Sequence, residues 1–419
     1  MSSASKNTFL TTLLIYFLPL SWVGASNWEF SGYATIGYSF ENESSLGLFR
    51  DSTQRKRFDR DGSFLPDSQI GLQASYQFNN KLRATTQIVY ADKADFSFDS
   101  SVEWAFLAYQ PRADIDFRIG RLSVDMFRIS DVRRLDFASM WLRPPSEVYG
   151  WIIPYSIDGI DVSKEYLVGD NFWRVKLQWG RTSPEIQTPD GTQTIETQFN
   201  RFAIFSAVLD RFVWSSRFTY ARFTTAEIGA NQRGLVDWLN GLSNIPSPAG
   251  AQAGMIASTL FNSYSTTVSY LQGSLSYQLD NWRLHGEIVE ISGDTILMPT
   301  GIGVTGIAGR QSGNFTPFAM LSYFKPGRDP YNLDPSWQQI PNNEVLTPIV
   351  LGLFNGPLIS QSTASLGLKW GLSQNTALKF QWDKTKIKAN GYGLWAYGDQ
   401  INLTDTDIDI FSLSLSVIF

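Results

Sequence analysis

The last residues of the chain alternate between large apolar and small polar side chains. Every second position from 411 to 419 is apolar, and serines fill most of the gaps, in the sequence FSLSLSVIF. A period of two sends successive side chains to opposite faces of a β-strand, so one face of this strand is apolar and the other is polar. About nine residues also suffice for a tilted strand to cross the hydrocarbon core of a bilayer. The chain end therefore predicts a strand that separates lipid from water.

The same alternation recurs along most of the chain. In WEFSGYATIGYSF, residues 28–40, the apolar side chains share one parity and most polar ones share the other. Clear alternation predicts strands at about 28–40, 68–78, 82–91, 102–110, 114–121, 159–168, 172–180, 198–208, 212–223, 264–279, 282–291, 315–325, 362–371, 376–386 and 408–419. Because bacterial barrels have an even number of strands, we place a weak sixteenth strand near 331–341, despite its prolines.

Short and long connections separate these predicted strands. Turns such as Asn79–Asn80 and Asp280–Asn281 are short, whereas other connections are long and polar, at 41–67, 122–158, 224–263, 292–313 and 385–407. Short turns on one side and long loops on the other are typical of outer-membrane barrels. An open sheet edge would leave backbone groups unpaired in lipid, so such strands must close on themselves. We therefore predict an all-β, antiparallel, up-and-down transmembrane barrel of sixteen strands.

A soluble β-sandwich would also contain two-faced strands, but two features argue against it. Aromatic residues recur at strand ends, for example Trp173 and Trp179, as expected for girdles at two membrane interfaces. The polar faces carry charged residues such as Arg118 and Lys379, which a dry core does not accept unpaired. A water-filled lumen accepts them, and a barrel of sixteen strands is wide enough to enclose one.

Composition excludes several other classes of protein. After residue 30, no run of eighteen apolar residues occurs that could form a membrane helix. The chain has no cysteine, and its formal net charge of −5 at pH 7 argues against a nucleic-acid partner. The single histidine, His285, makes a histidine-rich metal site impossible and disfavours a catalytic triad. We therefore expect neither an enzyme nor a cofactor or metal.

The N-terminus has the features of a secretory signal peptide. Lys6 precedes the apolar run Phe9–Leu20, and small residues follow around Ala25. The apolar run is too short to anchor a protein in a membrane, but it matches the length of a signal-peptide core. We predict cleavage after Ala25, which makes 1–25 the signal peptide and 26–419 the barrel domain.

The stretch from Arg118 to Tyr166 is the most informative one for function. It follows the fifth predicted strand, as the third loop of an up-and-down barrel, and it mixes aspartates with arginines. The chain resembles the Gram-negative outer-membrane porins in its signal peptide, its sixteen strands, its terminal Phe419 and the long loop after RIGRL. The run WLRPPSEVYG is also similar to porin sequences. The resemblance implies that the third loop folds into the lumen and narrows the pore.

The same resemblance implies two opposed sets of charges at the constriction. On the loop, the acidic set would be Asp125, Asp131 and Asp136. On the wall, the basic set of lumen parity would be Arg83, Arg118, Arg174 and Lys176. Opposed charges across a narrow gap create a transverse field that orders polar solutes and biases ions by sign. The loop carries more arginine than acid, which leaves the preferred ion open, and pairing among these charges to hold the loop in place is the alternative role.

The predicted function is passive diffusion of small hydrophilic solutes and ions across the outer membrane of a Gram-negative cell, which the protein reaches through the periplasm. One alternative is a substrate-specific channel for an anionic solute or a sugar. A second is a non-transport barrel, either an outer-membrane enzyme or a surface-binding protein. The resemblance also implies a homotrimer, contact with outer-membrane lipids and lipopolysaccharide, and Phe419 as the signal read by the insertion machinery.

Three further stretches suggest secondary features. The basic run Arg50–Gly62 in the first long loop would bind anions or lipopolysaccharide phosphates, or simply be solvated. Asp405, Asp407 and Asp409 occupy alternate positions, as in some calcium sites, but the glycine turn and the bidentate glutamate of an EF-hand are missing. GLVDWLNGL, in the fifth loop, is predicted to form a short helix.

Overall fold

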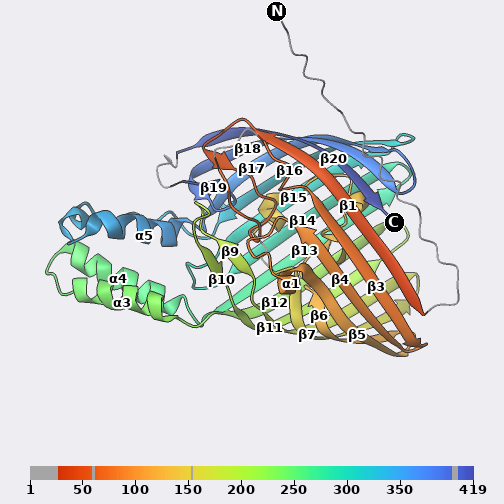
Figure 1. The fold of residues 1–419 in the computed structure, drawn as a ribbon, viewed down its shortest axis with the longest axis horizontal. Helices are drawn as coiled ribbons and strands as arrows, with labels where there is room; N and C mark the ends of the chain where they lie inside the picture. The colour runs from red at the N-terminus through yellow and green to blue at the C-terminus, as the bar shows by residue number, and fades with distance from the viewer. Residues whose placement is uncertain (1–26, 59–61, 152–153, 399–403) are drawn as a thin grey trace, which may run out of the picture.

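The computed structural model describes residues 27–58, 62–151, 154–398 and 404–419, so the predicted signal peptide lies outside the described residues. Sixteen antiparallel strands form a closed barrel (Figure 1). In chain order they are β1 (Trp28–Glu41), β3 (Gln69–Asn79), β4 (Leu82–Ala91), β5 (Val102–Arg112), β6 (Ile115–Ser123), β7 (Ser156–Val168), β8 (Asn171–Thr182), β11 (Phe199–Asp210), β12 (Trp214–Thr225), β13 (Thr267–Leu279), β14 (Trp282–Ser292), β15 (Gly301–Arg310), β16 (Phe315–Pro326), β17 (Ile359–Gly371), β18 (Thr376–Tyr392) and β20 (Thr406–Ile418). Strand β20 pairs with β1, which closes the barrel as predicted.

Smaller elements lie in the connections between the barrel strands. They are β2 (Leu46–Gly47), β9 (Glu185–Gln187), β10 (Thr194–Glu196), β19 (Ala396–Tyr397), α1 (Phe98–Ser101), α2 (Ser146–Tyr149), α3 (Ala230–Leu242), α4 (Pro248–Asn262), α5 (Asn343–Asn355), η1 (Ser130–Val132), η2 (Asp136–Ala138) and η3 (Pro335–Gln339). None of the helices in the described part of the chain is long and apolar enough to cross a membrane.

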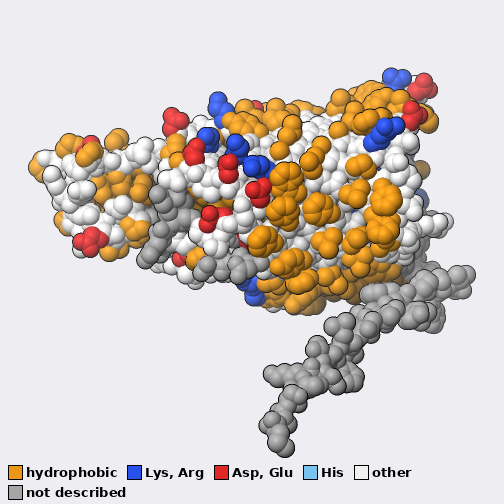
Figure 2. Space-filling view, turned by 90° about the horizontal axis from the view of Figure 1, so that it is seen from above, with side chains coloured by type: hydrophobic (Ala, Val, Ile, Leu, Met, Phe, Trp, Pro, Cys, Tyr) orange, Lys and Arg blue, Asp and Glu red, His pale blue; other side chains and the backbone are white. Residues whose placement is uncertain are grey.

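The two-residue alternation of the sequence becomes the two faces of the wall. On β1, Ile36 points outward and is 63% exposed, whereas Ser39 points inward and is 1% exposed. The hydroxyl of Ser39 donates a hydrogen bond to Ser412 Oγ of β20 at 2.8 Å, so polar side chains pair along the inner face across the closing seam. On the side of the barrel seen in Figure 2, apolar side chains are spread over the outer face and charged ones gather toward its ends. A wall of this kind suits lipid outside and a polar interior.

Two predictions about the strands are wrong. Residues 331–341 do not form the sixteenth strand; they contain η3, which begins at Pro335 and is followed by α5. The sixteenth strand is β15, Gly301–Arg310, inside the stretch 292–313 that was predicted as a loop. Its sequence GIGVTGIAGR places glycines where other strands have polar lumen residues, so the apolar-to-polar alternation is lost. The predicted number of strands is therefore correct, but the segment assigned to the sixteenth strand is wrong.

A helical lobe stands at the long-loop end of the barrel (Figure 1). It combines the connection between β12 and β13, with α3 and α4, and the connection between β16 and β17, with η3 and α5. These helices share a core in which Leu239, Ala253, Trp337 and Val350 are buried. The helix predicted from GLVDWLNGL is confirmed as part of α3.

Candidate pore constriction

The segment between β6 and β7, residues 124–155, is called the third loop below. Its Asp125 forms an ion pair with Arg217 of β12 at 2.9 Å, and its Tyr149 donates a hydrogen bond to Glu287 of β14. The backbone N–H of Leu142 donates to Oε1 of Gln381 on β18 at 2.8 Å. Glu287 and Gln381 are buried, the side chain of Arg217 is only 11% exposed, and the three residues lie on widely separated strands. The third loop therefore crosses the interior of the barrel.

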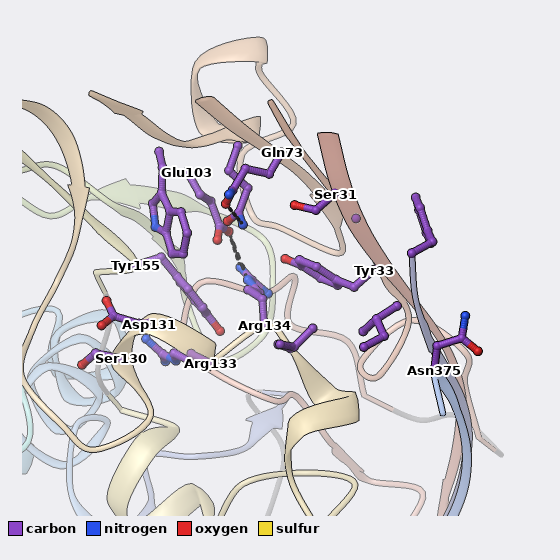
Figure 3. Close-up of a pocket in the computed structure, with 16 residues that line it drawn as sticks. Ser31, Tyr33, Gln73, Glu103, Ser130, Asp131, Arg133, Arg134, Tyr155 and Asn375 are labelled. Carbon is purple, nitrogen blue, oxygen red and sulfur yellow. Dashed lines mark hydrogen bonds and ion pairs between the residues drawn. The ribbon is translucent and has the colours of Figure 1, made fainter. Parts of the chain in front are cut away.

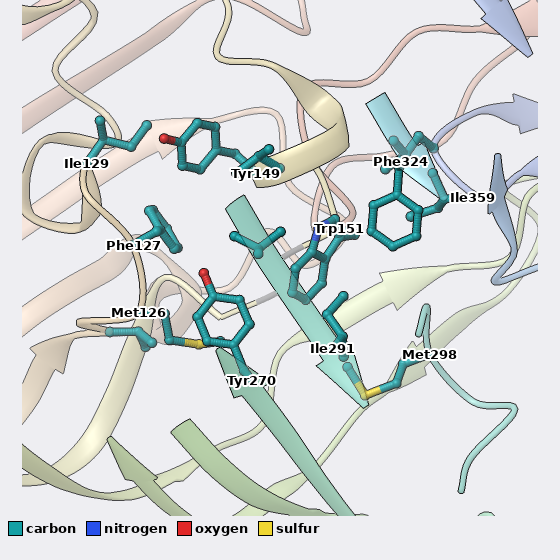
Figure 4. Packing of buried hydrophobic residues seen from close by; sticks show 14 of the residues in the cluster. Met126, Phe127, Ile129, Tyr149, Trp151, Tyr270, Ile291, Met298, Phe324 and Ile359 are labelled. Atoms are coloured by element: carbon teal, nitrogen blue, oxygen red, sulfur yellow. The ribbon is translucent and has the colours of Figure 1, made fainter. Parts of the chain in front are cut away.

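One side of the interior is an apolar core rather than a polar lumen. The third loop contributes residues such as Phe127, Tyr149 and Trp151, which pack against inward-facing wall residues including Tyr270 (Figure 4). The ring centroids of Trp151 and Tyr270 are 5.9 Å apart, and those of Phe127 and Tyr149 are 5.3 Å apart. Packing of this extent fixes the loop against β11 to β18 and removes that side of the lumen from the path of water.

The glycines of β15 let the third loop approach the wall closely. A Cβ atom added to Gly303 would lie 2.7 Å from the carbonyl oxygen of Glu147, and one added to Gly309 would lie 2.6 Å from Sδ of Met140. Glycine inside a strand commonly marks such an approach by another backbone or side chain. The glycines that remove the alternating pattern from β15 are thus the residues that close contact with the third loop requires.

The carboxylate of Glu147, in α2 of the third loop, is completely buried and is held by neutral donors. It accepts hydrogen bonds from Oγ of Ser322 at 2.6 Å, from Nε2 of Gln361 at 2.8 Å and from the hydroxyl of Thr363. Hydrogen bonds to an ionised acceptor are stronger than those between neutral groups. Glu147 therefore anchors the loop to β16 and β17, a role that its sequence neighbourhood did not indicate.

Two wall lysines hold the next part of the loop by its carbonyl oxygens. Nζ of Lys379, on β18, donates to the backbone oxygens of Asp136 and, at 2.7 Å, of Trp141. Nζ of Lys369, on β17, donates to the backbone oxygen of Phe137 at 2.5 Å. The third loop is therefore fixed on one side of the barrel by packing, carboxylate contacts and lysine contacts together.

The three acidic residues predicted for the constriction have different surroundings. Asp125 lies between Arg217 and Lys176, whose Nζ is 3.7 Å from its Oδ2. Burial alone would raise the pKa of Asp125, but these two cations hold the pKa below its ordinary value. Asp136 is buried in an ion pair with Arg50 of the first loop. Asp131 accepts a hydrogen bond from Oγ of Ser123 at 2.7 Å.

The four predicted wall cations lie on the short-turn half of the barrel. Arg118 and Lys176 both contact Asp161 of β7, at 2.6 and 3.5 Å. Arg174 forms an exposed ion pair with Glu165 at 2.7 Å. All four, Arg83 included, line an open cavity of about 410 Å³. The structure thus places Asp125 next to Lys176, and it places Asp131 on the cavity that the four cations line. Asp136 pairs instead with Arg50.

A second set of charges has the opposite arrangement, with arginines on the third loop and carboxylates around them. Arg134 contacts Glu103 of β5 at 2.9 Å, and Arg143 forms ion pairs with Asp67 and with Asp383 of β18. Glu103 escaped sequence analysis because its strand position has the parity of outward-facing residues. A register shift between β4 and β5 at this point turns the buried Glu103 inward, as a β-bulge does.

A cavity of about 540 Å³ separates the third loop from β1, β3, β4 and β5 (Figure 3). Its wall side includes Tyr33, Gln73 and Glu103, and its loop side includes Arg133 and Arg134. The guanidinium carbons of both arginines lie over the ring of Tyr155, 3.9 and 3.6 Å from its centroid. This side of the interior is open and is lined by charged residues of both signs, in contrast to the packed side.

Asp131 lines both this cavity and the 410 Å³ cavity on the short-turn side. It belongs to η1 and is exposed. Of the three predicted loop acids, it is therefore the one positioned between two open spaces. The smaller space carries Arg118 and Lys176 in its lining.

The secondary features predicted from sequence occupy other positions. In the first loop, residues 42–68, Arg50 and Asp51 are buried inside the barrel, while 59–61 lie outside the described residues.

The single histidine, His285, lies on the inner face of β14. Its Nδ1 lies 3.0 Å from Ser276 Oγ, and its Nε2 lies 3.2 Å from Glu287, which also accepts a hydrogen bond from Tyr149 of the third loop. These contacts anchor the third loop to the wall.

The alternating aspartates near the chain end face lysines. Asp405 pairs with Lys388 at 2.7 Å, and Asp407 lies 4.0 Å from Nζ of Lys386. Within the described residues, no group of three or more His, Cys, Asp or Glu side chains is placed to hold a metal ion. At the very end, the backbone N–H of Phe419 donates to Gly32 O of β1 at 2.9 Å, so the terminal residue extends the closing seam.

Comparison with known proteins identifies the fold class. No family model and no curated protein sequence matches the chain. Among solved structures, the anion-selective porin from Comamonas acidovorans matches with a TM-score of 0.53 and 12% identity, over 94% of this chain and 99% of that one. Outer-membrane expressed OmpT of Vibrio cholerae matches with a TM-score of 0.52 and 10% identity, over 95% and 99%. Salmonella typhi OmpF in complex with daunomycin matches with a TM-score of 0.51 and 12% identity, over 94% and 97%.

The sixteen-stranded closed barrel is therefore the fold of outer-membrane porins, as the sequence predicted. At 10–12% identity the likeness concerns the fold. What passes through this barrel has to be argued from its own residues.

Proposed function

We propose that the chain is an outer-membrane porin in which small hydrophilic solutes and ions diffuse passively between the third loop and the wall formed by β1, β3, β4 and β5. The observation that carries this proposal is the asymmetry of the interior. Apolar packing fills the side next to β11 to β18, whereas the opposite side holds an open cavity of about 540 Å³ lined by charged residues of both signs. An outer surface of apolar side chains supports the membrane location.

The path passes charged groups of both signs. The carboxylates of Glu103 and Asp131 and the guanidinium groups of Arg133 and Arg134 line the cavity, and Arg134 is paired with Glu103 at 2.9 Å. Because water is confined there between protein walls, these charges act on a passing ion more strongly than they would in bulk solvent. Asp131, which lines both cavities, is the residue that we expect to influence ion preference most. Of the three predicted acidic residues, only Asp131 would then lie on the path, while Asp125 and Asp136 hold the loop.

The direct test is the conductance of the purified protein in planar bilayers. General diffusion predicts discrete channel openings and a current that rises linearly with salt concentration. A reversal potential under a salt gradient then gives the ion preference. Absence of any conductance from correctly folded protein would contradict the proposal and favour a barrel that does not transport.

A second candidate is a channel specific for an anionic solute or a sugar. It is favoured by the stack of Arg133 and Arg134 on Tyr155 in the cavity, because guanidinium and aromatic groups bind carboxylates, phosphates and sugar faces. This candidate predicts a current that one solute blocks with saturation. Linear, unsaturated flux of the same solute supports general diffusion instead.

The proposal includes two expectations that come from the resemblance to porins. One is assembly as a homotrimer, which the mass of the protein in mild detergent tests. The other is recognition of the terminal Phe419 by the outer-membrane insertion machinery. Removal of that residue should then reduce the amount of folded barrel in the outer membrane, whereas a conservative change to tyrosine should not.

A further inference from the structure

The outer face of β6, β7, β8, β11 and β12 has two rows of apolar side chains and, nearer to the long loops, a row of charged ones. The first apolar row joins Ile119, Ile160, Trp179 and Ala203 through successive strand pairs and ends at Arg222. The second, one pair further from the long loops, joins Phe117, Val162, Leu177, Phe205 and Tyr220. The charged row begins with Arg121, Asp158 and Arg181 on the long-loop side.

The two apolar rows enclose a hollow on the outside of the barrel. Its volume is about 720 Å³, and Leu107, Phe117, Ile160, Trp179 and Phe205 are among the residues that line it. Trp179 is 57% exposed and Ile160 is 49% exposed, so the hollow is open to whatever surrounds the barrel. Arg222 lines one end. The hollow thus offers an apolar surface that ends at a cation.

Three exposed arginines lie at the long-loop end of this surface: Arg181 on β8, Arg201 on β11 and Arg222 on β12. Among the described residues, no carboxylate oxygen lies within 4.0 Å of any of their guanidinium nitrogens. Arg121, in contrast, is neutralised by Asp158 at 2.8 Å and by Asp99 at 3.1 Å. Asp158 also lies opposite Arg181 in the strand ladder, but its carboxylate is engaged by Arg121. In the described part of the chain, three positive charges without a close ion pair therefore lie on the outer face, where the apolar surface gives way to the loops.

The backbone of β11 is shaped to add Arg201 to this group. Phe199 and Phe202 are both buried in the interior although they lie three residues apart, and the register shifts between Asn200 and Ala203. Arg201 adopts a φ of 49°, which a residue with a side chain seldom does. A bulge of this type redirects a side chain. Here it leaves Arg201 exposed beside Arg222 instead of inside the barrel.

We propose that this surface is a binding site for a phosphorylated lipid with several acyl chains, of the outer leaflet. Guanidinium groups bind phosphate oxygens in pairs of parallel hydrogen bonds, so the three arginines would hold the phosphates. The hollow would take the acyl chains. The inference rests on the membrane orientation in the proposed function, with the long loops outward, because that orientation places the arginines at headgroup level.

A second cationic cluster on the same rim provides a matched control. Lys384, Lys386 and Lys388 are exposed on β18, but they face aspartates of β20 and the segment before it. Lys388 and Asp405 are 2.7 Å apart, and Lys384 is paired with Asp409 in the strand ladder. The two clusters have the same number of cations. Lys386 and Lys388 each have an aspartate oxygen within 4.0 Å, whereas none of the three arginines has a carboxylate oxygen that close among the described residues.

The test compares lipid binding by three forms of the purified full-length protein in detergent. These are the unmodified protein, the triple variant Arg181→Gln, Arg201→Gln and Arg222→Gln, and the control variant Lys384→Gln, Lys386→Gln and Lys388→Gln. Native mass spectrometry with added diphosphoryl, hexa-acylated lipid A measures the bound fraction. We expect binding by the arginine variant to weaken by about tenfold or more, with the control unchanged. Equal binding by all three forms, or an equal loss in both variants, would overturn the site.

Further ligands and readouts separate the alternatives. Phosphatidylethanolamine should bind weakly to all forms, because its single phosphodiester is balanced by its own ammonium group. An acyl-free glucosamine bisphosphate should bind weakly to the unmodified protein, because it has no acyl chains for the hollow. Equal binding of the acyl-free compound would show that a free phosphate suffices and would contradict a lipid site. If the arginine variant loses subunits but keeps lipid, the surface is an interface between copies. Channel conductance should be the same in all three forms, so failure of this site leaves the proposed function standing.

Discussion

Arg50 of the first loop and Asp136 of the third loop form a buried ion pair inside the barrel, although 86 residues separate them in the chain. Nη1 of Arg50 lies 3.2 Å from Oδ2 of Asp136, and both side chains are less than 5% exposed. Nε2 of Gln69, on β3, donates to the same carboxylate at 2.8 Å. Two loops and the wall thus meet at one carboxylate, which fixes the position of the third loop on the open side of the interior.

The first prediction concerns this ion pair. Asp136→Asn leaves buried Arg50 with only the more distant carboxylate of Asp67, at 3.9 Å, and loss of one partner of a buried pair costs roughly 3–5 kcal/mol of unfolding free energy. Denaturant titration of the refolded barrel, followed by its heat-modifiable mobility, measures this loss. The double variant Arg50→Met, Asp136→Leu removes both charges and should be the less destabilised of the two. Equal stability of Asp136→Asn and the unmodified protein would show that the pair does not fix the loops.

A second prediction concerns the glycine that the loop touches. Gly303→Val would place new atoms against the carbonyl of Glu147, and because backbone cannot yield easily there, the third loop must shift. Such overpacking costs about 1–3 kcal/mol, and single-channel conductance should change with it. Gly306→Val is the control, because a Cβ at that outward-facing position meets nothing within 4 Å. Identical conductance in both variants would mean that β15 does not position the loop.

The third prediction concerns acid. The pKa of Asp125 is lowered in the folded state, because Lys176 and Arg217 outweigh the opposing effect of burial. A carboxyl whose folded pKa is depressed contributes stability above its unfolded pKa, near 4, and that contribution is lost as the pH falls from there toward the folded pKa. The difference in unfolding free energy between the protein and Asp125→Asn should therefore be constant from pH 7 to about pH 5 and shrink below about pH 4. A difference that does not depend on pH would contradict this assignment.

A fourth prediction concerns ion preference. Asp131→Asn removes a negative charge that lines both open cavities, so the reversal potential under a salt gradient should move toward anion preference. Asp407→Asn, at an exposed position on the rim, removes the same charge away from the path and should leave the reversal potential unchanged. A larger shift for Asp407→Asn than for Asp131→Asn would place the ion path elsewhere.

The sequence was sufficient for the barrel because lipid on one side and polar groups on the other impose a period of two on each strand. It failed at β15, where contact with the third loop requires glycines such as Gly303 and so removes the polar half of the pattern. It also failed at 331–341, where Trp337 and Ile340 are apolar because they pack in the helical lobe and not because they face lipid.

The constriction was harder to predict than the wall, because its charges pair across loops that are distant in sequence. Asp136 was identified as a functional residue, but Arg50, its partner, lies in a loop with no periodicity that could indicate burial. Glu103 was missed because the register shift at its position reverses the parity of the strand. The inward or outward direction of a residue on a regular strand can be predicted from the local sequence pattern. The partners of residues at bulges and in loops are set only when the whole barrel is assembled.

The most direct test of the central claim is to locate the ion path with single cysteines, which this cysteine-free chain allows without background. Gln73→Cys lies on the cavity beside β1 to β5, and Ile307→Cys lies in the packed side. During single-channel recording, a charged methanethiosulfonate reagent should reduce the conductance of Gln73→Cys and leave that of Ile307→Cys unchanged. Reduction at Ile307→Cys alone, or no conductance from either folded variant, would contradict an aqueous path on the open side of the third loop.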